Sequence, residues 1–157
     1  MLVRPIAPTD EDAYRTILEA TSAEDRYCRF FHFVDHFDHE EVHRFVEDRE
    51  DTIGVIAFEG TVPLGAAHAV LLDAESAEIA IVVSQGTRRV GVGTALLDAL
   101  IARVKERGLR RLVACALREN HPFEHLARRA GFRVDEAEGA AVHWVLPLDV
   151  PDEVAAQ

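Results

Sequence analysis

The residues from Ala77 to Leu97 constrain the fold of this chain more than any other stretch. They read AEIAIVVSQGTRRVGVGTALL, which is an apolar strand, a turn that contains glycines, and the start of an amphipathic helix. The first N–H groups of a helix lack partners and the helix dipole adds positive charge there, so such a turn is a ready anion site. Gly91 and Gly93 have no Cβ, which lets a phosphate group approach the main chain closely.

The anion is expected to bind the main-chain amides of this turn, beside the charge of two arginines. The residues predicted to hold it are Arg88, Arg89, Val90, Gly91, Val92, Gly93 and Thr94. A Walker loop would need Lys at the position of Val92, and a dinucleotide fingerprint would need a small residue at Leu96. The remaining interpretations are an acyl-CoA turn of the form Arg-x-x-Gly-x-Gly and an ordinary strand-to-helix turn capped by glycines.

Two segments resemble motifs of the GNAT family of N-acetyltransferases. Arg88-x-x-Gly91-x-Gly93 is similar to motif A of that family, and ENHPFEHLARRAGF at residues 119–132 resembles motif B. More narrowly, Arg4-Pro5 and the stretch from Ser22 to Phe31 resemble the acetyltransferase domain of bacterial Pat-type protein lysine acetyltransferases. The resemblance covers nearly the whole chain. It implies one GNAT domain over residues 1–148, followed by a tail at 149–157.

The implied fold is of the mixed α/β class. It has a twisted, mostly antiparallel sheet of six to seven strands, splayed between strands 4 and 5 and flanked by about four helices. Periodicity and turn residues support the elements themselves. Strands are predicted at residues 2–6, 52–58, 62–72, 77–84, 110–116, 132–135 and 141–146. Helices are predicted from Thr9 as N-cap, over 22–49 with a break near 35–38, over 91–107, and from Glu119 or Asn120 to Gly131.

Composition narrows the class of partner. The 157 residues carry a formal charge of −11, which argues against binding to nucleic acid or anionic membranes and is compatible with a cationic substrate. No secretory signal or bilayer-spanning segment is visible. Cys28 and Cys115 lie in apolar contexts, as buried thiols do in a reducing compartment, so we expect a cytoplasmic protein.

The resemblance also implies the co-substrate, acetyl-CoA, whose pantetheine arm would lie between the splayed strands. Backbone groups of Ile81 and Val83 would be left without a strand partner there and would bind the pantetheine amides. The N–H of Val83 is the expected donor that polarises the thioester carbonyl. Asn120 is expected either to contact the pantetheine, as in the family, or simply to cap the last helix.

Glu78 is the predicted catalytic residue. An acceptor amine arrives protonated, and Glu78 begins a strand that is otherwise apolar. Burial raises the pKa of a carboxyl that enters a sheet, which suits a general base. Glu78 also resembles the base position of the protein lysine acetyltransferases. The alternative is a solvated glutamate at the start of a strand.

Two further questions concern the chemistry: which group protonates the leaving sulfur, and whether a metal is bound. Many family members place a tyrosine in motif B to protonate the leaving sulfur, but the matching residue here is Ala127. A thiol pKa near 8.5 makes the thiolate a tolerable leaving group, so activity need not depend on this tyrosine, and water, His121 or His125 could take its role. The histidines and aspartates between His32 and His43 lack the fixed spacing of a zinc site, so no metal is expected.

These observations predict an acetyl-CoA-dependent N-acetyltransferase that acts on a primary amine by direct attack with general-base help. The alternative is a non-catalytic acyl-CoA-binding sensor or assembly module of the same fold. The sequence leaves the acceptor open between a protein lysine and a small amine, since acceptor loops vary most. An exposed last hairpin would allow a homodimer.

Overall fold

The structure of the protein is a computed structural model. It describes residues 1–20, 39–47, 49–84 and 91–149. The helical segment predicted between residues 22 and 38, the turn residues Arg88, Arg89 and Val90, and most of the C-terminal tail lie outside the described residues.

The order of the elements is the predicted one. The strands are β1 (Leu2–Pro5), β2 (Thr52–Glu59), β3 (Val62–Leu71), β4 (Ser76–Val83), β5 (Arg111–Leu117), β6 (Arg133–Glu138) and β7 (Ala141–Pro147). The helices are the 3-10 turn η1 (Pro8–Asp10), α1 (Glu11–Glu19), α3 (His39–Val46), α4 (Val92–Glu106) and α5 (His121–Ala130). The prediction that Thr9 caps the first helix is wrong. Thr9 lies inside η1, and Asp10 is the N-cap residue of α1.

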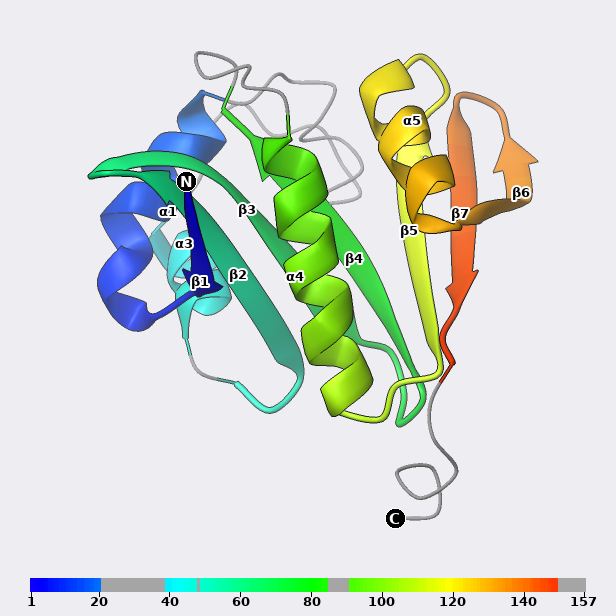
Figure 1. The fold of residues 1–157 in the computed structure, drawn as a ribbon, viewed down its shortest axis with the longest axis horizontal. Coiled ribbons are helices and arrows are strands. Elements are labelled where there is room, and N and C mark those ends of the chain that lie inside the picture. The colour runs from blue at the N-terminus through cyan, green and yellow to red at the C-terminus, as the bar shows by residue number, and fades with distance from the viewer. Residues whose placement is uncertain (21–38, 48, 85–90, 150–157) are drawn as a thin grey trace.

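All the strands form one sheet in the order β1-β2-β3-β4-β5-β7-β6. Every neighbouring pair is antiparallel except β4 and β5, which run parallel. The parallel pairing extends only from Ser76 opposite Arg111 to Ile79 opposite Ala114. Beyond that point the two strands separate into a V (Figure 1). The predicted splay between the fourth and fifth strands is therefore confirmed.

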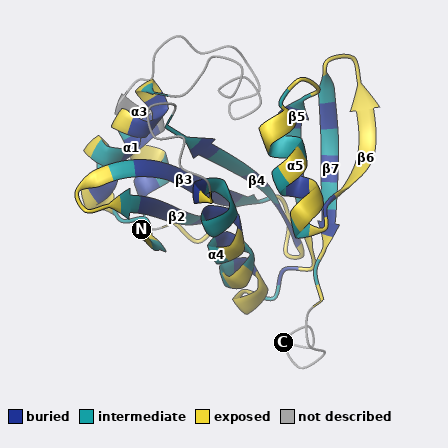
Figure 2. Ribbon diagram, turned by 45° about the horizontal axis from the view of Figure 1, so that its top comes forward, coloured by how far each residue is buried: buried dark blue, intermediate teal, exposed yellow. Residues whose placement is uncertain are grey.

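The sheet separates two hydrophobic cores. On one face α4 and α5 pack over β2 to β5 and β7, where Leu96, Leu100 and Trp144 are among the buried side chains. On the other face α1 and α3 cover β2, β3 and β4, with Tyr14 and Ile17 buried against them. Figure 2 shows the difference in burial along the sheet, from buried central strands to β6, whose six residues are all exposed.

Local sequence sets where α4 and α5 begin and end. α4 follows Gly91, whose φ of 101° lies in the left-handed region, and the chain turns out of the helix at Gly108, whose φ is 79°. α5 begins after Asn120, whose side chain accepts the N–H of Phe123 at 3.1 Å, and it ends at Gly131. These ends place α4 and α5 side by side, with Leu126 of α5 against Gly93 of α4.

Candidate active site

The split between β4 and β5 forms the centre of the site. The N–H of Ser84 donates to the carbonyl of Leu64 on β3, and the carbonyl of Glu75 accepts from Arg110 and Arg111, which lead into β5. Backbone groups alternate in direction along a strand, so those of Ile81 and Val83 point toward β5. Both residues lie beyond the last β4–β5 pair, at Ile79 and Ala114. Their N–H and C=O groups therefore face the open part of the split.

The N-terminus of α4 lies at the end of the sheet where the strands are apart (Figure 1). The first helical hydrogen bond runs from the N–H of Ala95 to the carbonyl of Gly91 at 2.9 Å. The preceding amides, those of Val92, Gly93 and Thr94, have no partner within the helix. Among the described residues no side chain caps this end, and its first turn holds no acidic residue. Both observations leave the helix dipole available to an anion.

Gly91 provides room for such an anion. A Cβ built on Gly91 would meet no atom of the described residues within 4 Å. Its φ of 101° is also strained for any residue with a side chain. Gly93 differs, because its Cβ would make ordinary van der Waals contact with Leu126 at 3.4 Å. Among the described residues, Gly91 thus borders open space, whereas Gly93 is a position of close packing between α4 and α5.

Glu78 lies on the other face of the sheet. Ala77 and Ile79 pack into the α4–α5 core, whereas Val82 packs with α1 and α3, so alternation directs Glu78 to the α1–α3 face. The residue is half-buried and sits beside Val113 of β5, one pair before the split opens. Glu78 thus lies on the sheet face opposite α4, next to the last paired residues of β4 and β5.

A tight turn fixes the start of β4. The carboxylate oxygen Oδ1 of Asp73 accepts the N–H groups of Glu75 and Ser76, each at 2.8 Å. The bond from Glu75 lowers the pKa of Asp73, because backbone N–H donors stabilise its charged form. This turn sets the register of β4 two residues before Glu78, and with it the face on which Glu78 lies.

Helix α5 carries the residues considered for proton transfer to sulfur. Ala127, at the position where many family members have tyrosine, is completely buried against the α4–α5 core. His121 and His125 are exposed. The side-chain oxygen of Asn120 serves as the helix cap, as the simpler of its two interpretations predicts. Its contact with pantetheine stays a prediction.

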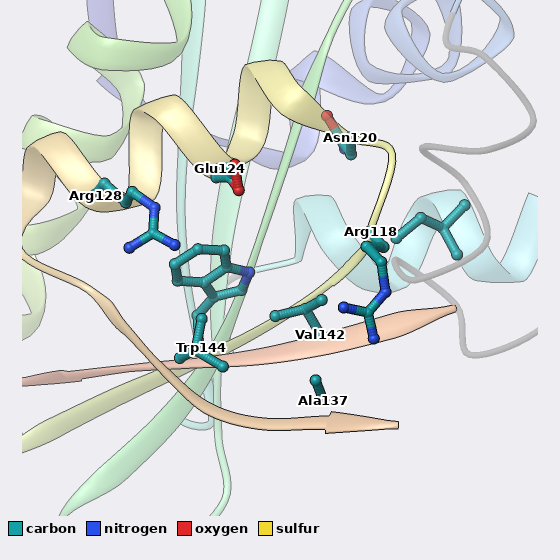
Figure 3. A pocket seen from close by; sticks show the side chains of 9 residues that line it. Arg118, Asn120, Glu124, Arg128, Ala137, Val142 and Trp144 are labelled. Atoms are coloured by element: carbon teal, nitrogen blue, oxygen red, sulfur yellow. The ribbon is translucent and has the colours of Figure 1, made fainter. Parts of the chain in front are cut away.

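A separate pocket of about 140 Å³ lies between α5 and the β6–β7 hairpin. Its lining comes from Leu117, Arg118, Asn120, Glu124, Arg128, Val134, Ala137, Val142 and Trp144. In Figure 3 the Arg128 guanidinium lies near the indole of Trp144, 5.1 Å from its centroid, where the contact holds α5 on β7. Among the lining residues only Asn120 belongs to the predicted CoA site, so this pocket is distinct from the split.

The structure describes only part of the His-rich segment. His43 of α3 lies 2.9 Å from Glu47 and 3.7 Å from Glu11, while His32, Asp35, His36 and Asp38 lie outside the described residues. Within the described ranges no three His, Cys, Asp or Glu side chains come together as a metal site would require. None of the helices described is both long enough and apolar enough to cross a membrane.

The sequence model of the acetyltransferase (GNAT) family matches residues 14–132. The chain belongs to the GNAT family of acetyltransferases. This confirms the resemblance of the two motifs, and the fold agrees with it. The match includes β4, the start of α4, β5 and α5, which together build the split.

Solved structures extend the comparison. The GNAT domain of S. lividans PAT is 28% identical, with a TM-score of 0.82 over 93% of this chain and 89% of that one. A phosphinothricin acetyltransferase from Sinorhizobium meliloti, in complex with acetyl-CoA, is 19% identical, with a TM-score of 0.74 over 94% of this chain and 88% of its own. The PaiA N-acetyltransferase from Thermoplasma acidophilum, in complex with coenzyme A, is 15% identical, with a TM-score of 0.68 and coverages of 94% and 98%. Members of this fold are thus solved with acetyl-CoA or CoA.

Sequence reasoning missed two residues near the split, one on β5 at its edge and one on β7, the next strand. Cys115 of β5 and His143 of β7 are opposite each other in the register. The alternation of β7, with buried Val142, Trp144 and Leu146, could have shown that His143 points away from α5. What could not be foreseen is that β7, and not β6, lies beside β5.

Proposed function

We propose that this protein is an acetyl-CoA-dependent N-acetyltransferase that transfers the acetyl group to a primary amine by direct attack. The observation that carries the proposal is the split between β4 and β5. A helix N-terminus that no described side chain caps, with an open glycine, lies at its mouth, and a half-buried carboxylate lies on the opposite face of the sheet. The acetyl donor would enter from one side of the sheet and the amine from the other.

Different residues would bind the pyrophosphate, the pantetheine and the thioester of acetyl-CoA. The amides of Val92, Gly93 and Thr94 would bind the pyrophosphate, with Arg88, Arg89 and Val90 completing the turn. Backbone groups of Ile81 and Val83 would bind the pantetheine amides as a missing strand would. The N–H of Val83 would polarise the thioester carbonyl. Asn120 would contact the pantetheine from the start of α5.

In the transfer itself the amine nitrogen bonds to the thioester carbon and the C–S bond breaks. The carboxylate of Glu78 accepts the amine proton, directly or through a water molecule. The sulfur leaves as a thiolate, which is tolerable at neutral pH because free thiols have a pKa near 8.5. This is consistent with Ala127 at the position where other members of the family place tyrosine.

The acceptor is a cationic amine, either a protein lysine or a small molecule. The net charge of −11 supports a cationic acceptor, and the 28% identity to the GNAT domain of S. lividans PAT supports the Pat-type resemblance. A cytoplasmic location and a homodimer through the exposed hairpin are part of the same proposal.

The test is incubation of the protein with acetyl-CoA and a panel of amines, read by release of free thiol. The panel should hold a lysine-containing peptide, α-N-acetyl-lysine amide, spermidine and an aminoglycoside. Amine-dependent thiol release is the expected result. Tight CoA binding without turnover on any of these amines would instead favour a non-catalytic acyl-CoA-binding module.

A further inference from the structure

The sheet face that carries Glu78 continues across the split onto β5 and β7. On β5, Leu112 and Ala114 pack into the α4–α5 core, so Val113 and Cys115 point to the opposite face. On β7, Val142 and Trp144 pack into the same core, so His143 also points to the face of Glu78. Alternation along three strands thus brings these side chains to one surface.

The register places His143 one strand beyond the β5 edge of the split, level with its open part. Pairing between β4 and β5 ends at Ala114, so Cys115 is the first β5 residue beyond it. The β7 residue opposite Cys115 is His143. Side chains of directly opposed residues in antiparallel strands have Cβ atoms about 5 Å apart, so Cys115 and His143 are neighbours. From strand spacing and rise, the Cα atoms of Glu78 and His143 are about 12 Å apart.

The surroundings of His143 suit a ligand. The residue is half-buried, and within the described part of the chain its imidazole makes no hydrogen bond or ion pair. Helices α1 and α3 pack on β2, β3 and β4, while α5 covers the opposite face of β7. The nearest residue on the outer side is Glu136 of β6, which is exposed and opposite His143 in the register.

We propose that His143 is an acceptor-binding residue, whose imidazole accepts a hydrogen bond from the ammonium group of the incoming amine on the β5–β7 side of the split. The proposal rests on the acetyltransferase function proposed above and adds a second protein contact to the acceptor. A neutral imidazole has one nitrogen that accepts a hydrogen bond, and an ammonium group has three donors. An acceptor held between His143 and Glu78 would deliver its nitrogen to the split.

Charge on this face favours the same ligand. Glu136 is directly opposite His143, Arg133 lies one cross-strand pair further along the same face, and Glu78 lies on the far side of β5, so the charge nearest to His143 is a carboxylate, which attracts a cation. The carboxylates alone would bind a cation anywhere along the strip. The imidazole nitrogen of His143 is a neutral hydrogen-bond acceptor. It lies opposite Cys115, the first β5 residue after the β4–β5 pairing ends, and a hydrogen bond to it would fix the position of the amine.

The experiment compares His143→Ala and His143→Gln with the unchanged protein in the thiol-release assay, using α-N-acetyl-lysine amide as acceptor. His143→Ala should raise the KM for this amine about 10-fold or more, because a hydrogen bond to a charged group is lost. The KM for acetyl-CoA should not change. His143→Gln should recover part of the loss, since its amide oxygen can accept the same bond. Val145→Ala, half-buried on the same face of β7, is the control for lost packing.

A second readout does not depend on turnover. The imidazole ¹⁵N resonances of His143, assigned by their absence in His143→Gln, should shift when α-N-acetyl-lysine amide is titrated into the CoA-bound protein. The norleucine analogue, which lacks the amine, should leave them in place. Unshifted resonances, or an unchanged amine KM in His143→Ala, would overturn the proposal. Absence of thiol release by the unchanged protein would count against the acetyltransferase function instead, and the resonances would still decide for or against His143 as an amine-binding residue.

Discussion

The guanidinium of Arg4 donates two hydrogen bonds to the carboxylate of Asp10, from Nη1 to Oδ2 at 2.8 Å and from Nη2 to Oδ1 at 2.7 Å. The N–H of Ala7 donates a third bond to Oδ2 at 2.8 Å. Asp10 is buried, with 5% of its surface exposed, and it is the N-cap residue of α1. These hydrogen bonds connect the edge strand β1 to the start of α1, the helix that packs on the same sheet face as Glu78. The hydrogen bonds from Arg4 lower the pKa of Asp10, because they favour its charged form.

Replacement of Asp10 by asparagine should lower the free energy of unfolding by about 1–3 kcal/mol at neutral pH, since a part-buried guanidinium loses its charged acceptor. The folded-state pKa lies below the unfolded value near 3.9, so this stabilisation is complete above that value and is lost as the pH falls through the folded pKa. Urea unfolding at pH 7 and at pH 3 measures both effects.

The control for that comparison is Asp51→Asn. Asp51 also pairs with an arginine, Arg49, at 3.1 Å, but the pair is exposed and should contribute about 1 kcal/mol or less. Equal losses of stability in the two variants would show that burial of Asp10 contributes nothing.

His68 hydrogen-bonds to the C-terminal end of α3. Its Nε2 lies 2.9 Å from the carbonyl oxygen of Phe45, one of the last-turn carbonyls of α3 that lack a helical partner. The ring packs edge-on against Tyr14 and Phe45, and only 1% of His68 is exposed. The N–H at Nε2 donates this bond, which ties α3 to β3.

Gly54 makes room for that ring, so Gly54→Ala should destabilise the protein. A Cβ at Gly54 would lie 2.8 Å from Cδ2 of His68 and 2.6 Å from Cγ2 of Ile6, which is too close for either contact, so these side chains would have to shift. We expect a loss of about 1–3 kcal/mol, measured by thermal or urea unfolding. Gly93→Ala is the control, because alanine there meets only Leu126 at 3.4 Å and should gain helix propensity. A stable Gly54→Ala variant would mean that His68 is not held in place.

The sequence predicted the elements well because their signals are local. Apolar alternation marks the strands, and Gly108, Asn120 and Gly131 mark helix ends by their own conformational preferences. The family resemblance added the splay, since a strand's neighbours cannot be inferred from its own residues. The prediction of an N-cap at Thr9 was wrong because residues 8–10 form a 3-10 turn, which moves the start of the helix one residue on; the contact of Asp10 with Arg4 on β1 was not visible in the local sequence.

For the candidate site too, the sequence indicates residues with a local signal but not residues that depend on which strands are neighbours. The glycine turn and Glu78 are readable because each departs from its surroundings, a flexible turn before a helix and a charge in an apolar strand. Nothing in their own strands marks Cys115 and His143, and only the pairing of β4 with β5 and of β5 with β7 brings them near the split. The register between strands far apart in the sequence is set by the whole sheet, so it cannot be predicted from the residues of one segment.

Replacement of Gly91 by valine should weaken CoA binding about 10-fold or more. The side chain would occupy the open space at the start of α4 and would strain a backbone with a φ of 101°. Calorimetry with CoA measures the affinity. Gly139→Val is a matched control, because Gly139 also has a positive φ of 59° and open space around it, but lies in the β6–β7 turn. Unchanged affinity in Gly91→Val would place the pyrophosphate elsewhere.

Glu78→Gln is the sharpest test of the proposed chemistry. Glutamine keeps the shape of the side chain but cannot accept the amine proton, so kcat should fall about 100-fold or more while CoA affinity stays constant. Higher pH should partly restore kcat, because more of the amine then arrives neutral. Steady-state thiol release across pH, with CoA affinity from calorimetry, measures all three quantities.

The matched control for Glu78 is Glu75→Gln, three residues earlier in the turn before β4, where the glutamate side chain is 72% exposed. It removes the same charge from nearly the same part of the sheet, so it separates a general-base role from a change in local potential. If both variants lost activity equally, the acidic field of this face would explain the loss, and proton transfer to Glu78 would not be needed. A Glu78→Gln variant with normal kcat at neutral pH would leave the amine to lose its proton to solvent. Loss confined to Glu78→Gln, with rescue at high pH, can come only from a residue that removes the proton itself.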